Sequence, residues 1–233
     1  LTWADVLPST ASLAAVALTV VAYSLALLAY RRSGSSLLLP VLTGAALVAA
    51  VLLVWRIPYE AYAGGARPLS WLAGPATVAL AVPLHRHWAR LKGLWWPITA
   101  ALLVGSITAV TSAIAIAWLL GGDLALQMSL APKSATMPVA MPVASRLGGQ
   151  ASLSAVAVAL TGIAGAVLAG ALFRLLRLRD EAVQGFALGT AAHAIGTARA
   201  VQISDGAVAF AALGMGMNAI VTGLLVPLLG LLR

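Results

Sequence analysis

The chain has 233 residues, of which 62% are hydrophobic and only 9% are charged, whereas charged side chains make up roughly a quarter of an ordinary soluble domain. Its 14 Lys and Arg outnumber its six Asp and Glu, but aromatic residues are not interleaved with the basic ones as a nucleic-acid platform requires. These properties exclude a soluble domain and argue against nucleic-acid binding. We predict an all-α integral membrane protein that is embedded in a lipid bilayer.

The N-terminal part predicts two membrane spans, at residues 11–30 and 37–54, since about 20 apolar residues cross a hydrocarbon core of ~30 Å. An arginine pair at 31–32 ends the first span. Residues 55–70 contain Trp and Tyr, which suit the headgroup region. We assign residues 1–70 to an N-terminal scaffold. The N-terminus lacks the basic region and cleavage site of a signal peptide, so none is expected.

A shorter apolar stretch at residues 71–84 predicts a broken helix, with Thr77 near its middle. Its helix-breaking residues are Gly74, Pro75 and Pro83. A basic loop follows at residues 85–93, and residues 95–120 then predict a long, uninterrupted span.

Residues 126–149 are the most informative stretch, because prolines and charges interrupt an apolar sequence there. Its prolines are Pro132, Pro138 and Pro142. Residues 151–173 predict a further span, which ends at a basic loop, 174–181. If residues 126–149 crossed the membrane once, this loop would face the side opposite Arg31 and Arg86. The preference of basic loops for the cytoplasm therefore favours a re-entrant hairpin, which the bilayer tolerates where protein or a watery cavity surrounds it.

A second interrupted stretch, residues 183–203, contains Gly196 and precedes a final span at 207–229. Ala76–Leu84 (ATVALAVPL) resembles Ala135–Val143 (ATMPVAMPV), although chance matches also arise in a composition this rich in Ala and Val. We interpret the similarity as an inverted repeat, which is typical of secondary transporters.

The predicted architecture is therefore about six full transmembrane helices plus two broken or re-entrant helical hairpins. Residues 71–233 would form a repeated transport unit with helix breaks in 71–84, 126–149 and 183–203. A broken helix points free N–H groups and a positive dipole end into its cavity, which suits an anion.

Ionisable groups at membrane depth are costly, so each is a candidate for function. Lys133 at the first hairpin tip, together with Ser134 and Thr136, would bind a carboxylate. The structural alternative is a lysine that extends to the interface and a serine that caps a helix. Thr77 corresponds to Thr136 in the repeat.

The second interrupted stretch offers His193, Thr197 and Arg199. His193 would contact substrate or carry a proton, or else be a neutral imidazole bonded to a backbone carbonyl. Arg199 would pair with a carboxylate substrate, or else with Asp205 or the membrane surface. The three histidines lack carboxylates at ligand spacing, so neither a metal nor a cofactor is predicted. No nucleotide-binding or hydrolase motif occurs, so no enzyme is predicted either.

Three stretches together resemble the LrgB/CidB family of membrane proteins. They are residues 57–62 with 72–84 (IPYEAY, LAGPATVALAVPL), 130–149 (LAPKSATMPVAMPVASRLGG) and 187–199 (ALGTAAHAIGTAR). The resemblance runs from about residue 10 to 230, and it departs from the family pattern at Met137 and Met141.

This resemblance implies a bacterial inner-membrane protein with one of two functions. One is a transporter of small monocarboxylates such as glycolate, glycerate or pyruvate; the other is a holin- or antiholin-like regulator of murein hydrolase activity and lysis. It also implies a small LrgA/CidA-type membrane protein as partner and leaves a homo-oligomer open. Two polar-tipped broken hairpins favour the transporter, because a lysis regulator needs amphipathic or oligomerising helices.

Overall fold

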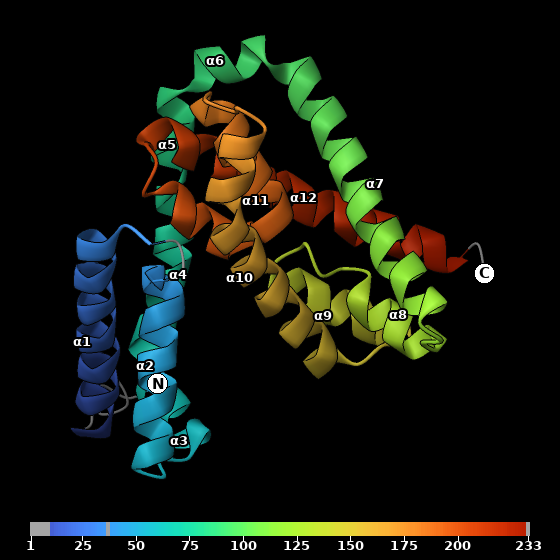
Figure 1. Ribbon diagram of the computed structural model, residues 1–233. Coiled ribbons are helices and arrows are strands. Elements are labelled where there is room, and N and C mark those ends of the chain that lie inside the picture. Colours follow the sequence, from blue (N-terminus) through green and yellow to red (C-terminus); the bar gives the residue numbers. More distant parts are fainter. Residues whose placement is uncertain (1–9, 36–37, 232–233) are drawn as a thin grey trace. The chain divides into compact units, whose positions relative to one another are not determined.

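The computed structural model describes residues 10–35 and 38–231, and within these ranges the chain forms twelve helices and no strand. It divides into two compact units, Leu1–Ala79 and Leu80–Arg233 (Figure 1). The division falls inside the stretch for which the sequence predicts a broken helix.

Four helices form the first unit, and α1 is the longest of them. Their bounds are α1 Thr10–Ser33, α2 Pro40–Val54, α3 Tyr59–Gly65 and α4 Arg67–Ala79. The α1 helix packs closely on α3, because a side chain on Gly65 would lie 2.9 Å from the Ala11 carbonyl oxygen. The hydroxyls of Thr19 and Tyr62 are 2.8 Å apart and join the same two helices.

The break predicted at residues 71–84 is found at Leu80, where α4 ends and α5 (Ala81–Arg86) begins. Pro83 accounts for it, since a proline ring clashes with the carbonyl four residues earlier, which here belongs to Ala79. Gly74 and Pro75, predicted as breaks, instead lie inside α4.

The second unit contains α5 and seven further helices. These are α6 Trp88–Gly93, α7 Trp95–Leu119, α8 Leu124–Leu130, α9 Met137–Arg146, α10 Ala151–Leu175, α11 Glu181–Ala200 and α12 Asp205–Leu231. Four described helices (α1, α7, α10 and α12) are long and apolar enough to cross a membrane. The α2 helix covers only about 22 Å at 1.5 Å per residue. Six full crossings and the inverted repeat therefore remain predictions.

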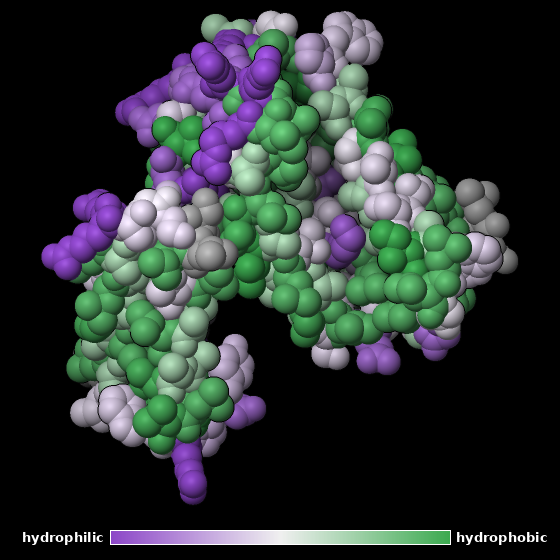
Figure 2. All heavy atoms as spheres, viewed as in Figure 1, coloured by the Kyte–Doolittle hydropathy of each residue, from purple (hydrophilic) through white to green (hydrophobic). Residues whose placement is uncertain are grey.

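The basic loops before α7 and after α10 lie at the same end of the second unit. Arg90 joins them by donating to Asp180 at 2.8 Å and to Glu181 at 3.0 Å. Hydrophilic residues gather at this end, around α6 and the start of α11, while the flanks are largely hydrophobic (Figure 2). We call it the basic end. This clustering agrees with the predicted placement of both loops on one side of the membrane.

The carboxyl of Asp180 is held in its ionised form by its surroundings. Loss of hydration raises the pKa of Asp180, but hydrogen bonds from the backbone N–H groups of Val183 and Ala182, together with the Arg90 guanidinium, outweigh it. The net result is a pKa below the ordinary value of an aspartate.

The α8 and α9 helices form the first hairpin, at the end of the unit away from α6 (Figure 1). The hairpin joins α7 to α10, which are both 25 residues long and both reach the basic end. It therefore begins and ends at the far side. The turn between its helices, residues 131–136, contains Pro132, and Pro138 lies in the first turn of α9, where a proline is tolerated. Pro142, predicted as a break, lies inside α9.

The α11 helix is itself a second hairpin, because the chain reverses at His193. Residues 194–200 fold back on residues 181–192 so closely that a side chain on Gly196 would lie 2.1 Å from the Leu188 carbonyl oxygen. The predicted break at Gly196 is therefore displaced by three residues to His193. Gly196 instead permits the two halves to touch.

The α12 helix then runs alongside the first half of α11, and glycines set the close spacing between them. Side chains on Gly185 and Gly189 would lie 2.2 Å and 2.0 Å from the carbonyl oxygens of Ala207 and Ala211. Small residues that let helix backbones approach are the usual interface in membrane bundles. The α12 helix therefore supports the second hairpin.

Candidate functional site

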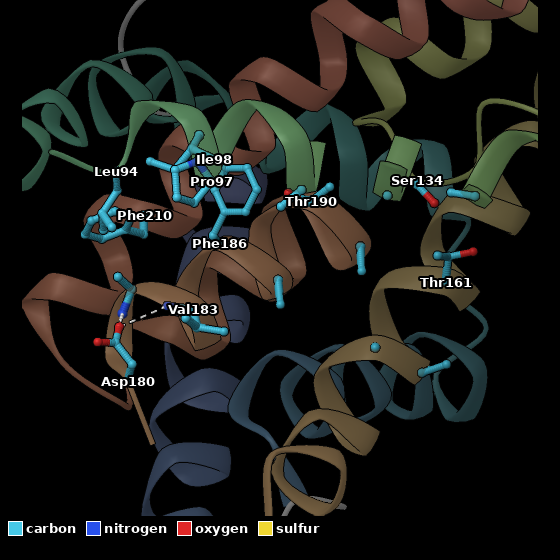
Figure 3. Close-up of a pocket in the computed structure, with 18 of the residues that line it drawn as sticks. Leu94, Pro97, Ile98, Ser134, Thr161, Asp180, Val183, Phe186, Thr190 and Phe210 are labelled. Carbon is cyan, nitrogen blue, oxygen red and sulfur yellow. Dashed lines mark hydrogen bonds between the residues drawn. The ribbon is translucent and has the colours of Figure 1, made fainter. Parts of the chain in front are cut away.

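A cleft of about 770 Å³ runs between α7, α10 and α11 in the second unit. Asp180 lies at one end of it, and Ser134 and Thr161 lie at the other, with Phe186 and Thr190 between (Figure 3). From residue 180 to 191 along α11 is roughly 16 Å at 1.5 Å per residue. The cleft thus reaches from the basic end to about half of a ~30 Å hydrocarbon core.

Small side chains make room for this cleft. Ala101, Gly105 and Ala109 line it from α7, and Thr161 and Gly165 line it from α10. Their spacing of four residues places each set on one face of its helix. None of these five was predicted as a site residue, although the spacing itself is visible in the sequence.

Asn218 of α12 holds the tip of the first hairpin. Its Nδ2 donates to the carbonyl oxygen of Ser134 at 2.9 Å, and its Oδ1 accepts from the hydroxyls of Ser106 at 2.7 Å and Thr222 at 3.3 Å. Asn218 and Ser106 lie near the middle of their helices and are both buried. The tip is therefore fixed at about half the depth of the helices.

His193 forms the tip of the second hairpin, with a backbone φ of 42° that side chains rarely adopt. Its Nε2 lies 2.9 Å from the carbonyl oxygen of Val158 in α10. Because a carbonyl only accepts, Nε2 carries the proton. Gly162 makes room for the ring, since a side chain there would lie 2.7 Å from Cε1. This geometry matches the alternative reading of His193 as a buried imidazole bonded to the backbone.

Val158 brings the two hairpin tips together. Its carbonyl oxygen accepts from His193, while its side chain packs in one cluster with Ala135 and Ala140 of the first hairpin. Thr197 is buried one turn beyond His193, and its hydroxyl donates to the His193 carbonyl oxygen at 2.9 Å. The tips of the two hairpins thus meet at Val158, and their role as one binding site stays a prediction.

Lys133 provides the positive charge at the inner end of the cleft. It lines the cleft beside Ser134 and is partly buried. No carboxylate of the described residues lies within ion-pair distance of its ammonium group. Thr136 immediately precedes α9, and its side chain does not cap the first backbone N–H groups of that helix. A cation and a helix N-terminus next to each other favour an anion.

Of the other predicted site residues, Arg199 lies outside the cleft and Thr77 belongs to the first unit. Arg199 donates to Gln202 Oε1 at 2.6 Å and lines a different pocket near the basic end, because the reversal at His193 carries it away from the tip. Thr77 belongs to the first unit, where its exposed hydroxyl donates to the Ala73 carbonyl oxygen at 2.8 Å. Across the described ranges, no three or more His, Cys, Asp or Glu are grouped so as to hold a metal ion.

Comparison with known proteins decides the family. The family model described as LrgB-like matches residues 19–232. The chain belongs to the LrgB-like family. It is 37% identical over 213 residues to the uncharacterized protein YxaC of Bacillus subtilis (strain 168), a match that covers 91% of this chain and 93% of YxaC. No solved structure matches.

Two further LrgB-family relatives carry a functional name. The antiholin-like proteins LrgB of Bacillus mycoides (strain KBAB4) and Bacillus cereus (strain B4264) are each 29% identical over 214 residues, covering 91% of this chain and 93% of theirs. The predicted family is confirmed, and with its apolar helices the chain is a membrane protein of that family. The names of these relatives support the antiholin-like prediction more than a monocarboxylate transporter.

Proposed function

We propose that this LrgB-family protein transports a small monocarboxylate of the glycolate, glycerate or pyruvate type through the cleft. The observation that carries the proposal is the position of Lys133. It places a cation at the inner end of a cleft that extends to the basic end of the bundle, next to two helix breaks. A lysine at membrane depth costs about 2.5–3.5 kcal/mol, and an anion beside it offsets that cost.

The hairpin tips supply the remaining contacts in this proposal. Lys133 would bind the carboxylate, while the hydroxyls of Ser134 and Thr136 would form hydrogen bonds with a hydroxyl or keto oxygen of the substrate. His193 and Thr197 support the second tip from behind, since both bond to backbone carbonyls. Interrupted helices that meet near the midplane are the usual setting of such sites in transporters.

Uptake of labelled glycolate, glycerate and pyruvate into proteoliposomes tests the proposal. Lys133→Met is expected to lower uptake at least tenfold, because losing a charged hydrogen bond costs about 1.5–3 kcal/mol. Arg146→Met is the matched control: it removes an exposed basic side chain at the other end of α9 and should leave uptake unchanged. Equal uptake by both variants and the parent protein would rule out Lys133 as the carboxylate site.

Antiholin-like regulation of murein hydrolase activity is the second candidate, and the names of the relatives favour it. It predicts that deleting this protein alters autolysis, and that Lys133→Met restores normal autolysis to the deletion strain as well as the parent protein does. If instead Lys133→Met neither transports the acids nor restores normal autolysis, the regulation of autolysis depends on transport. A protein that supports no uptake of any of the three acids but restores normal autolysis would exclude the transporter.

A further inference from the structure

A second cavity, of about 330 Å³, lies at the basic end beside the last turn of α10. Four arginines line it, and they come from two separate parts of the chain. Three follow one another at the end of α10 and in the loop after it, and Arg199 comes from the returning half of α11. Gln184, from the entering half of α11, completes the polar wall. We call this cavity the arginine pocket; its arginines are Arg174, Arg177, Arg179 and Arg199.

Three of these positive charges, at the end of α10 and in the loop after it, are not balanced by carboxylates of the described residues. Within the described part of the chain, no carboxylate lies within ion-pair distance of Arg174, Arg177 or Arg179, and the neighbouring Asp180 and Glu181 pair with Arg90 instead. Like charges gathered around a cavity repel one another, and a bound anion relieves that repulsion. Membrane orientation requires basic residues near the end of a span, but it does not require them to converge on a pocket.

The backbone at Arg177 is left-handed. Its φ is 55°, in the left-handed region that glycine favours. The position directly follows α10, where the N–H of Leu178 donates to the Phe173 carbonyl oxygen at 2.8 Å. A glycine is usual at this point of a helix end, yet the chain has an arginine whose side chain lines the pocket. An arginine with a left-handed backbone also follows α2, at Arg56, so what distinguishes Arg177 is that it lines the pocket together with three other arginines.

The remaining walls indicate which anion fits. Phe173, Leu178 and Ile203 give the pocket an apolar side. Gly170 and Phe173 belong to α10, which is long and apolar enough to cross a membrane, so acyl chains can lie along the same helix. A phosphate group attached to a hydrocarbon chain matches both parts, whereas a free phosphate uses only the arginines.

We propose that the arginine pocket binds the phosphate group of an anionic phospholipid from the leaflet at the basic end. The guanidinium groups donate to the phosphate oxygens in the planar, bidentate geometry that arginine favours, and the acyl chains lie along α10. Basic pockets between membrane helices on the cytoplasmic side are known to bind such headgroups. The same phosphate chemistry is offered by a soluble phosphate, so the test must separate the two sources.

Native mass spectrometry of the detergent-purified protein, titrated with phosphatidylglycerol, phosphatidylcholine or inorganic phosphate, provides the test. Phosphatidylglycerol should bind saturably and more tightly than the other two. Arg177→Gly should weaken it about fivefold, and the double variant with Arg174→Gln about 25-fold, since each basic residue near an anionic surface contributes about a fivefold affinity. Neither change should unfold the protein, because glycine suits the left-handed backbone at 177 and position 174 keeps a long polar side chain.

Arg56→Gly is the matched control. Arg56 also follows a helix with a left-handed backbone, at φ 53°, but it is exposed at the end of α2 and does not line the pocket. It should leave phosphatidylglycerol binding unchanged. The proposal is overturned if both glycine variants weaken binding equally, or if phosphatidylglycerol does not bind saturably. Inorganic phosphate binding as tightly as phosphatidylglycerol would overturn the assignment to a lipid.

Discussion

Replacing Asn218 by alanine should loosen the tip of the first hairpin. The side chain is 1% exposed and bonds to the Ser134 carbonyl oxygen and the Ser106 hydroxyl. Without it, both partners are buried and unpaired. Such a loss costs about 1–3 kcal/mol per group in soluble proteins, but polar pairs in membrane bundles average about 0.6 kcal/mol. We expect a total of about 1–3 kcal/mol.

Thermal unfolding in detergent, followed by circular dichroism, measures this loss against a matched control. Thr111→Ala removes an exposed hydroxyl of α7 that bonds only within its own helix, and it should change stability by no more than a few tenths of a kcal/mol. Asn218→Asp separates the two contacts, because a carboxylate still accepts from Ser106 but cannot donate to Ser134. Equal stability of Asn218→Ala and Thr111→Ala would refute the view that Asn218 holds the tip.

Three further predictions concern packing, charge and topology. Gly189→Leu should prevent folding, because a side chain there meets the Ala211 carbonyl. Gly216→Leu is the control and should fold, because a side chain at 216 meets nothing within 4 Å. Size-exclusion chromatography distinguishes the folded from the aggregated variant. The pKa of Asp180 is lowered in the folded protein, so the stability that its carboxylate contributes is complete above the ordinary aspartate pKa of about 3.9 and is lost as the pH falls through the folded-state pKa. Arg90→Gln should therefore reduce the acid dependence of the unfolding midpoint. An unchanged pH profile would contradict this. Cysteines introduced at Gly93 and Leu176 should both be shielded from an impermeant thiol reagent in intact cells, and labelling of either would show that the basic end faces outward.

The sequence alone determined the class of protein and the family. A chain with so few charged residues cannot cover a soluble surface, and long apolar runs form membrane helices because every backbone group must be bonded within the segment. Pro132 and Pro83 lie where helices are interrupted, whereas Pro75 and Pro142 lie inside α4 and α9, so a proline alone does not locate a break. Lys133, Ser134 and Thr136 could be selected as site candidates because they lie at such an interruption.

Only the tertiary structure decided what the second hairpin does with its polar residues. The chain reverses at His193 and not at Gly196, because the Val158 carbonyl accepts from the imidazole and Gly162 leaves space for the ring. Both partners belong to α10, and Val158 lies 35 residues before His193 in the chain, so no local sequence pattern predicts these contacts. The reversal holds His193 at the hairpin tip, against the Val158 carbonyl oxygen, and carries Arg199 to the arginine pocket at the basic end. Sequence spacing placed these two residues in one site, but the long-range contact at Val158 separates them.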